Sequence, residues 1–257
     1  MKSIHKLITI LSVGMFVIAT SCSKTIDVDP VSVITTNSFW KTEDDVNGGL
    51  SGMYLYLRQQ AALNLFIWGE ARSNDLQWGQ VSGTLDYDFY YNNTLTANST
   101  GPSWLNLYTC INASNLIIKY APGITFKSES QKNNVLAQAY TMRAFIYFVM
   151  ARTWGGVPIR TEPIEGYDEQ TIQKERASTN EVFSLIKADL EQAIQLFPNN
   201  SFQSGRNKWS KAGAYALKAD VYLWTGKRLN GGASDFTTAL DACNQVATAN
   251  VDLLPNY

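Results

Sequence analysis

The stretch that decides the fold is RAFIYFVMARTWGGVPI, residues 143–159. Eight uncharged residues lie here between Arg143 and Arg152. A helix that spans a bilayer needs about 20 consecutive apolar residues, so this run is too short to cross a membrane. It suits a helix that is buried among other helices and wet only at its edges, where the two arginines lie. Gly155 and Gly156 then predict the end of that helix.

The apolar residues around this stretch follow a helical register that recurs downstream. Spacings of four, three and four residues are typical of the first helix of a tetratricopeptide repeat, and a second helix with a terminating proline follows. The same pattern then occurs once more. The register consists of Tyr140, Ala144, Tyr147 and Ala151; Phe183, Ile186, Leu190, Ala193 and Pro198; Tyr215, Ala219, Tyr222 and Gly226; and Phe236, Ala239, Cys243 and Val246. We therefore expect helices packed in tetratricopeptide-like pairs.

Helical periodicity extends over most of the chain and predicts an all-α fold. The predicted helices are 43–62, 103–120, 130–153, 179–196, 210–225 and 235–249. Capping signals support their starts: Thr42 precedes an acidic first turn, Ser128 stands three residues before Gln131, and Ser178 three before Glu181. Helices 43–62 and 103–120 are expected to form a third pair. Long insertions separate the partners, and the longest, 64–102, is rich in polar and aromatic residues.

The composition excludes several classes of partner. The chain has 257 residues and a formal net charge of −1, whereas nucleic acids and anionic membrane surfaces usually attract a basic face. Charged residues make up 17 % and aromatic residues 12 %, which is typical of a folded domain rather than a disordered one.

The N-terminus has the features of an export signal. Two lysines precede about thirteen mostly apolar residues, and Ala19-Thr20-Ser21-Cys22 follows. This tetrapeptide resembles a bacterial lipobox, which predicts a lipoprotein signal peptide over 1–21, acylation of Cys22 and a surface tether over 22–38. The alternative is an ordinary cleaved signal with a chance cysteine. The remaining residues, 39–257, are predicted to form the helical domain.

The residues available for catalysis are few. The only histidine is His5, inside the predicted signal, so a mature chain lacks the base of Ser-His-Asp and Cys-His sites and the usual zinc ligands. Cys110 and Cys243 are interpreted as two buried thiols, with a disulfide as the alternative. Asp86 and Asp88 could offer oxygens to calcium but lack the rest of a ligand loop, so we expect no metal and no cofactor.

Six ordered blocks of the chain carry a family resemblance. They are SFWKTEDDVNGGLSGMY, WLNLYTCINASNLI, AYTMRAFIYFVMARTWGGVPI, RASTNEVFSLIKADLEQAI, GRNKWSKAGAYALKADVYLWTGK and LLPNY. The chain resembles the SusD/RagB group of outer-membrane nutrient-binding lipoproteins of Bacteroidetes over essentially all of 22–257. The resemblance implies tetratricopeptide-like helical pairs, no catalysis, and a lid on a SusC-like TonB-dependent transporter that captures glycans or other oligomers at the cell surface. Family members are usually about twice this length, so the chain is expected to be an N-terminal half or a short member.

The insertion between the first two predicted helices supplies the residue types that bind neutral sugars. Aromatic rings cover the apolar face of a sugar, while amides, carboxylates and guanidinium groups bind its hydroxyls. The predicted ligand-binding residues are Arg72, Asp75, Trp78, Tyr90, Tyr91 and Asn92. The alternative is that these aromatic residues pack under the loop as a small satellite core. Trp104 and Tyr108 are expected to serve packing.

Three functions follow for comparison. The first is glycan capture without chemistry, followed by delivery to the transporter. The second is a protein-interaction scaffold whose helical pairs hold a partner, chiefly the transporter. The third, a glycoside hydrolase with paired carboxylates, has little support in the sequence.

Overall fold

The structure is a computed structural model that describes residues 39–61, 63–73, 75–76, 87–96, 98–99, 103–166 and 168–249. The predicted signal peptide, Cys22 and the tether lie outside the described residues, as do Trp78 and Asp86. The predictions that fall on them stay predictions.

Long helices form the body of the molecule. They are α3 (Glu43–Ala61), α6 (Leu105–Tyr120), α7 (Glu129–Trp154), α9 (Thr179–Leu196), α10 (Lys211–Arg228) and α11 (Gly232–Ala247). Each predicted helix is confirmed, with its ends within three residues of the predicted ones. Short helical turns lie in the insertions: α4 (Asn64–Trp68), η2 (Glu70–Arg72), α5 (Asp88–Tyr91), α8 (Glu169–Ile172) and η4 (Ser204–Arg206). The described part of the chain contains no strand, and none of its helices is long and apolar enough to span a membrane.

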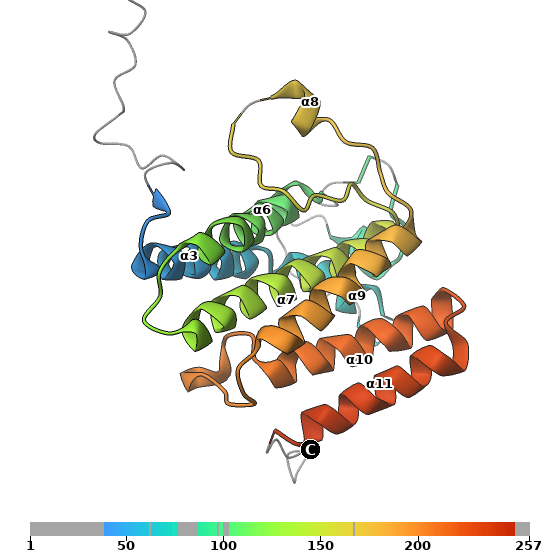
Figure 1. Ribbon diagram of the computed structural model, residues 1–257. Coiled ribbons are helices and arrows are strands. Elements are labelled where there is room, and N and C mark those ends of the chain that lie inside the picture. Colours follow the sequence, from blue (N-terminus) through green and yellow to red (C-terminus); the bar gives the residue numbers. More distant parts are fainter. Residues whose placement is uncertain are drawn as a thin grey trace, which may run out of the picture. The chain divides into compact units, whose positions relative to one another are not determined.

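The long helices pack as three pairs. α3 packs against α6, α7 against α9, and α10 against α11, while contacts of α6 with α7 and of α9 with α10 join the pairs (Figure 1). This arrangement confirms the predicted all-α fold of tetratricopeptide-like pairs, including the third pair.

Helix α7 lies at the centre of the core. It has 26 residues and is therefore about 39 Å long at about 1.5 Å per residue. Ala144, Tyr147 and Ala151 of the predicted register are buried, and so are Ile146, Phe148 and Met150 on other sides of the helix. A helix segment that is apolar on all sides is typically buried on all sides. This burial explains why residues 144–151 resemble a membrane segment in sequence although they lie in the core.

The helix starts follow the predicted capping signals. Ser178 and Glu181 form a complete capping box, in which the Ser178 hydroxyl accepts from the Glu181 N–H and the Glu181 carboxylate accepts from the Ser178 N–H. At the start of α3, Thr42 and Asp45 bond to each other in the same way. These bonds satisfy N–H groups that a helix start would otherwise leave unpaired.

Two glycines end α7 and close the insertion behind it. Gly155 has φ of 75°, the left-handed region that favours glycine. A Cβ on Gly156 would lie 2.1 Å from the carbonyl oxygen of Ala177, so only glycine fits where the two ends of the insertion meet. The Ala177 N–H also donates to the Val157 carbonyl at 3.1 Å. The insertion 157–176 therefore leaves and re-enters the helical core at one point.

The register predicted for the last helix is wrong in part. In α11 the inward positions are Ala239 and Ala242, whereas Cys243 is exposed and Phe236 is 42 % exposed. The Phe236 ring still lies against α10, as its distance from Gly226 shows: a Cβ on Gly226 would come within 2.7 Å of the ring. The two thiols are free, so the disulfide alternative is excluded, but only Cys110 is buried as expected.

Candidate functional site

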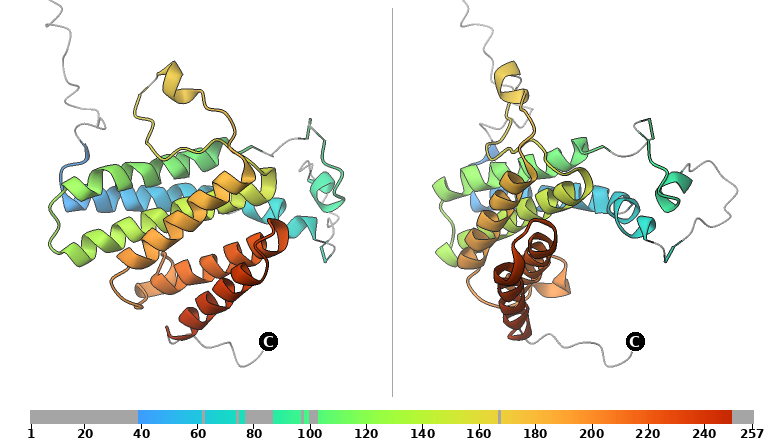
Figure 2. Two further views of the ribbon diagram at one scale, coloured as in Figure 1. Left: turned by 45° about the vertical axis from the view of Figure 1, so that its right-hand side comes forward. Right: turned by 90° about the vertical axis from the view of Figure 1, so that its right-hand side faces the viewer.

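Apart from Trp78, which lies outside the described residues, the predicted ligand-binding residues lie in and around η2 and α5, at the end of the bundle where α7 ends (Figure 2). Arg72 joins the two sides of this insertion, because its Nε donates to the Asn93 side-chain oxygen at 3.1 Å and its carbonyl accepts from the Asn93 amide at 3.2 Å. This pair holds the turn after η2 against the turn after α5.

The other predicted residues divide into buried and exposed groups. Tyr90 is 1 % exposed and packs on Phe89, with ring centroids 4.7 Å apart, and burial raises its pKa. Tyr91 is half-buried against the core. Asp75 and Asn92 are exposed, and Asn92 caps the C-terminal end of α5. The structure thus places Arg72, Asp75 and Asn92 where a ligand can touch them, while Tyr90 packs in the way that the satellite-core alternative describes.

A cluster of tryptophans connects this insertion to α7. Trp154, the last residue of α7, lies edge-on to Trp68 of α4 and to Trp104, with ring centroids 5.0 and 5.9 Å apart. The Arg176 guanidinium lies 5.4 Å from the Trp104 ring. Trp104 and Tyr108 are both partly buried against the core, which confirms that they serve packing.

A groove of about 320 Å³ opens beside the tryptophans, between α4, α7 and α10. This size is typical of sites for small ligands, which measure roughly 300–1,000 Å³. The groove combines three aromatic rings with a carboxylate, a guanidinium and a hydroxyl. These residues are Trp68, Phe145, Trp224, Glu70, Arg152 and Thr153.

Arg152 is held beside the groove on two sides. Its guanidinium lies 4.2 Å from the centre of the Phe148 ring and 3.7 Å from the Asp220 carboxylate. Both charged partners are partly exposed, at 37 % and 55 %, so the ion pair is screened by water and leaves the guanidinium able to bind other acceptors. Flat aromatic faces next to such a donor are the combination that binds a sugar ring.

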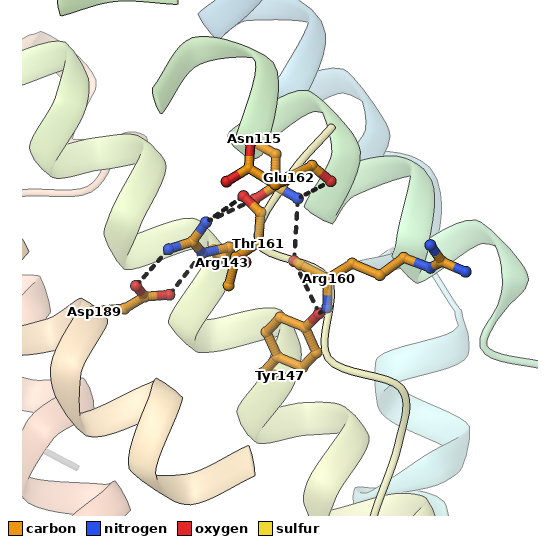
Figure 3. Close-up of polar contacts among 7 residues, drawn as sticks. All are labelled: Asn115, Arg143, Tyr147, Arg160, Thr161, Glu162 and Asp189. Carbon is orange, nitrogen blue, oxygen red and sulfur yellow. Dashed lines mark hydrogen bonds and ion pairs between the residues drawn. The ribbon is translucent and has the colours of Figure 1, made fainter. Parts of the chain in front are cut away.

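A buried polar network fixes the helices behind the groove. Arg143 of α7 is 4 % exposed and donates from Nε and Nη2 to the Asp189 carboxylate of α9 at 2.8 and 2.7 Å. Its Nη1 donates to the Asn115 side-chain oxygen of α6 at 2.7 Å and to the Thr161 carbonyl at 3.3 Å (Figure 3). One guanidinium therefore joins three helices and the insertion 157–176.

The same network holds the start of that insertion against the core. The Asn115 amide donates to the carbonyls of Arg160 and Glu162 at 3.1 and 3.3 Å, and the Tyr147 hydroxyl accepts from the Arg160 N–H at 2.6 Å (Figure 3). Burial raises the pKa of Tyr147 to about 12, so it remains a neutral hydroxyl. These bonds satisfy backbone groups that would otherwise be buried without partners.

The electrostatics of the pair favour its ionised form. Burial disfavours the Arg143 cation, but the hydrogen bonds and charge of Asp189 outweigh this and raise the pKa of Arg143. Burial also raises the pKa of Asp189, and the hydrogen bonds from Arg143 oppose that change. Because arginine stays protonated in proteins, the bidentate pair is a buried ion pair.

The expectation that Arg143 lies at a water-exposed edge is wrong. The sequence did contain a signal, because Asp189 lies next to Leu190 and three residues after Ile186, on the apolar face of its helix. A carboxylate on one apolar face and an arginine on another, in two helices expected to pair, indicate a buried partner.

The described residues contain no cluster that could hold a metal ion. Burial raises the pKa of Cys110 to about 12, and an inert thiol of this kind is no nucleophile.

The comparisons with known proteins agree with this fold. A family model described as SusD-like, starch-binding associating with outer membrane, matches residues 27–223. The chain belongs to the SusD-like family. The family is described as starch-binding and as associating with the outer membrane.

Individual SusD-like relatives resemble the whole described domain. A SusD-like protein of Formosa agariphila is 31 % identical over 239 residues, which cover 93 % of this chain and 46 % of that protein. The solved structure of NanU from B. fragilis has 33 % identity and a TM-score of 0.77, covering 88 % of this chain and 46 % of that one. A laminarin-binding SusD-like protein shares the fold at 22 % identity, with a TM-score of 0.70 over 85 % of this chain and 48 % of that one. The chain spans about half the length of the relatives that it matches.

Proposed function

We propose that this SusD-like chain is a cell-surface lipoprotein that captures glycans or other nutrient oligomers and passes them to a SusC-like TonB-dependent transporter, without catalysis. The proposal includes a signal peptide over 1–21, a tether over 22–38 and acylation of Cys22. The observation that carries it is the groove at the end of α7, in which aromatic rings and hydrogen-bonding groups face one space in a chain of a glycan-binding family.

Binding without chemistry suits the groove. Its charged groups are one carboxylate and one guanidinium, Glu70 and Arg152, whereas glycoside hydrolysis uses two carboxylates on either side of the scissile bond. Aromatic stacking and hydrogen bonds to hydroxyls hold a neutral sugar without changing it.

Glycan binding is tested by calorimetry of the purified protein against a panel that includes laminarin. Trp224→Ala removes an aromatic wall, and Glu70→Gln changes only the charge of an exposed lining residue. Glu175→Gln is the matched control, because Glu175 is exposed and lies in the insertion 157–176, outside the groove. We expect both groove variants, but not the control, to bind more weakly. Failure of the protein to bind any glycan in the panel would remove this function.

Anchoring is tested by labelling cells with radioactive palmitate. The protein should incorporate label and a Cys22→Ala variant should not, because the acyl chains need this thiol. Label in the variant would contradict the proposed anchor.

A protein-interaction scaffold is the second candidate. Three large apolar side chains are exposed on the last helical pair, Leu223, Phe236 and Leu240, at 50 %, 42 % and 61 %. Such residues on neighbouring helices are typical of a surface that another protein covers. Co-purification with the transporter gene product, combined with no glycan binding, would favour the scaffold over glycan capture.

A further inference from the structure

A second groove lies toward the N-terminal end of α7, away from the tryptophans. It measures about 380 Å³ and is bounded by α3, by the first turns of α7 and by the segment 198–208, which contains η4. Figure 1 shows that α7 begins at the end of the bundle where α9 ends and α10 begins, and the segment 198–208 that lines the groove joins these two helices.

Three lining residues of this groove, Asn134, Gln138 and Gln203, belong to one chain of hydrogen bonds. The Tyr54 hydroxyl accepts from the Trp209 N–H at 2.7 Å and donates to the Gln138 side-chain oxygen at 2.8 Å. The Gln138 amide nitrogen in turn donates to the Asn134 side-chain oxygen at 2.6 Å, and Gln203 donates to the same oxygen at 3.3 Å. Gln138 is 1 % exposed, so its amide is fixed by the core and not by water.

This chain determines which way the Asn134 amide faces. Its oxygen accepts two hydrogen bonds and has no lone pair left, so the orientation of the group follows from the network. Its NH₂ group donates no hydrogen bond to the described residues, and Asn134 is one of the residues that line the groove. Asn47 is exposed in the facing wall, and its side chain makes no hydrogen bond to the described residues. The groove therefore offers amide groups that are held in place and have unused hydrogen-bonding capacity.

The remaining lining residues favour a neutral ligand. Glu43 and Lys208 contribute one charge of each sign, and the Glu43 carboxylate already accepts the Lys127 N–H at 2.8 Å. Leu50 and the ring of Phe202 supply apolar surface. Amides that donate and accept beside an apolar ring match the alternating hydroxyls and C–H faces of a neutral sugar.

We infer that this amide groove is a second binding site for neutral oligosaccharides. The inference rests on the proposed function for its ligand class, but it assigns separate residues. Both grooves use α7: Gln138 and Phe145 are seven residues apart and lie on the same side of the helix. Asn134 and Val149 are 15 residues apart, which is about 22 Å along the helix axis. A glycan long enough to reach both grooves binds more tightly than a short one, because the second contact is intramolecular.

The test is calorimetric titration of the purified protein with laminarin and with short laminarin oligosaccharides. Asn134→Asp keeps the oxygen that accepts from Gln138 and Gln203 and removes the NH₂ donor. Asn47→Ala removes an exposed side chain that holds nothing else in place. Asn244→Asp is the control, because Asn244 is exposed on α11, away from both grooves, and the substitution adds the same charge.

We expect laminarin to bind each groove variant about tenfold more weakly, the effect of one lost hydrogen bond to a ligand. The control should bind like the unaltered protein. Unchanged affinity of both groove variants, together with weaker binding by Trp224→Ala, would overturn the second site and leave the proposed function intact. If the unaltered protein bound no oligosaccharide, both the proposed function and the second site would be wrong. Because Asn47→Ala leaves the network intact, weaker binding by this variant would support the second site even if Asn134→Asp misfolded.

Discussion

Replacement of Asp189 by leucine tests whether the buried ion pair stabilises the packing of α7 on α9. The side chains of Arg143 and Asp189 are 5 % and 4 % exposed, and two hydrogen bonds of 2.8 and 2.7 Å join them. Asp189→Leu leaves the guanidinium buried without a carboxylate, so we expect a loss of about 3–5 kcal/mol in the free energy of unfolding. A loss of this size is a large part of the roughly 5–15 kcal/mol that stabilises a typical protein.

Replacement of the other partner, Arg143, should change the stability in a way that depends on pH. Arg143→Met leaves a buried carboxylate, whose pKa burial already raises and the loss of the guanidinium raises further. A carboxyl with a higher pKa in the folded than in the unfolded protein binds more protons when folded, so stability falls as the pH rises through that range. The loss in the free energy of unfolding that Arg143→Met causes, relative to the unaltered protein, should therefore become smaller as the pH falls from about 7 to about 5. The deficit of Asp189→Leu should not, because the guanidinium stays charged.

The assay is urea unfolding at both pH values, followed by tryptophan fluorescence and circular dichroism. The double variant Arg143→Met, Asp189→Leu should recover much of the loss, because apolar residues of similar volume often replace a buried ion pair without penalty. Asp220→Leu is the control, since its ion pair with Arg152 is exposed and should contribute less than about 1 kcal/mol. The reasoning is refuted if Asp189→Leu loses no more than Asp220→Leu, or if the double variant is as unstable as the worse single variant.

Two further predictions concern backbone packing and thiol chemistry. Gly156→Ala should destabilise the protein by about 1–3 kcal/mol in thermal unfolding, because the new Cβ would lie 2.1 Å from the Ala177 oxygen. Gly52→Ala, in the middle of α3 with no atom within 4 Å of the new Cβ, should instead stabilise it by about 0.5–1 kcal/mol; the same sign for both changes would contradict the structure. A thiol reagent followed by mass spectrometry should modify the exposed Cys243 in the folded protein and Cys110 only in denaturant, since Cys110 is buried and burial raises its pKa to about 12. Equal reactivity in the folded state would show that α6 opens.

Most of the helical framework was predictable because its signals are local. The helix at 179–196 begins at the capping box that Ser178 and Glu181 predict. It ends two residues before Pro198, where the pattern predicted its end. Gly155 ends α7 where the sequence placed the stop. Capping residues, glycines and apolar spacing act within one or two turns of the chain, so they can be recognised without knowing what the helix packs against.

The candidate binding residues were less predictable. Arg72 and Asn92 are accessible, but Tyr90 is buried, although all three come from the same aromatic and polar insertion. Composition identified the insertion, whereas accessibility depends on how the loop folds back on Trp68 and α7. The groove lining from α7 and α10, including Arg152 and Trp224, was missed, since these residues belong to helices whose spacing is explained by packing alone.

The sequence by itself determined that this chain forms paired α-helices, where each long helix begins and ends to within three residues, and to which family the chain belongs. Only the tertiary structure decided that Arg143 meets Asp189, 46 residues away, and that α4, α7 and α10 enclose one groove. The physical reason is the distance along the chain over which each interaction acts. Helix formation depends on neighbours within a few residues, while buried pairs and grooves depend on side chains that approach only after the helices have packed.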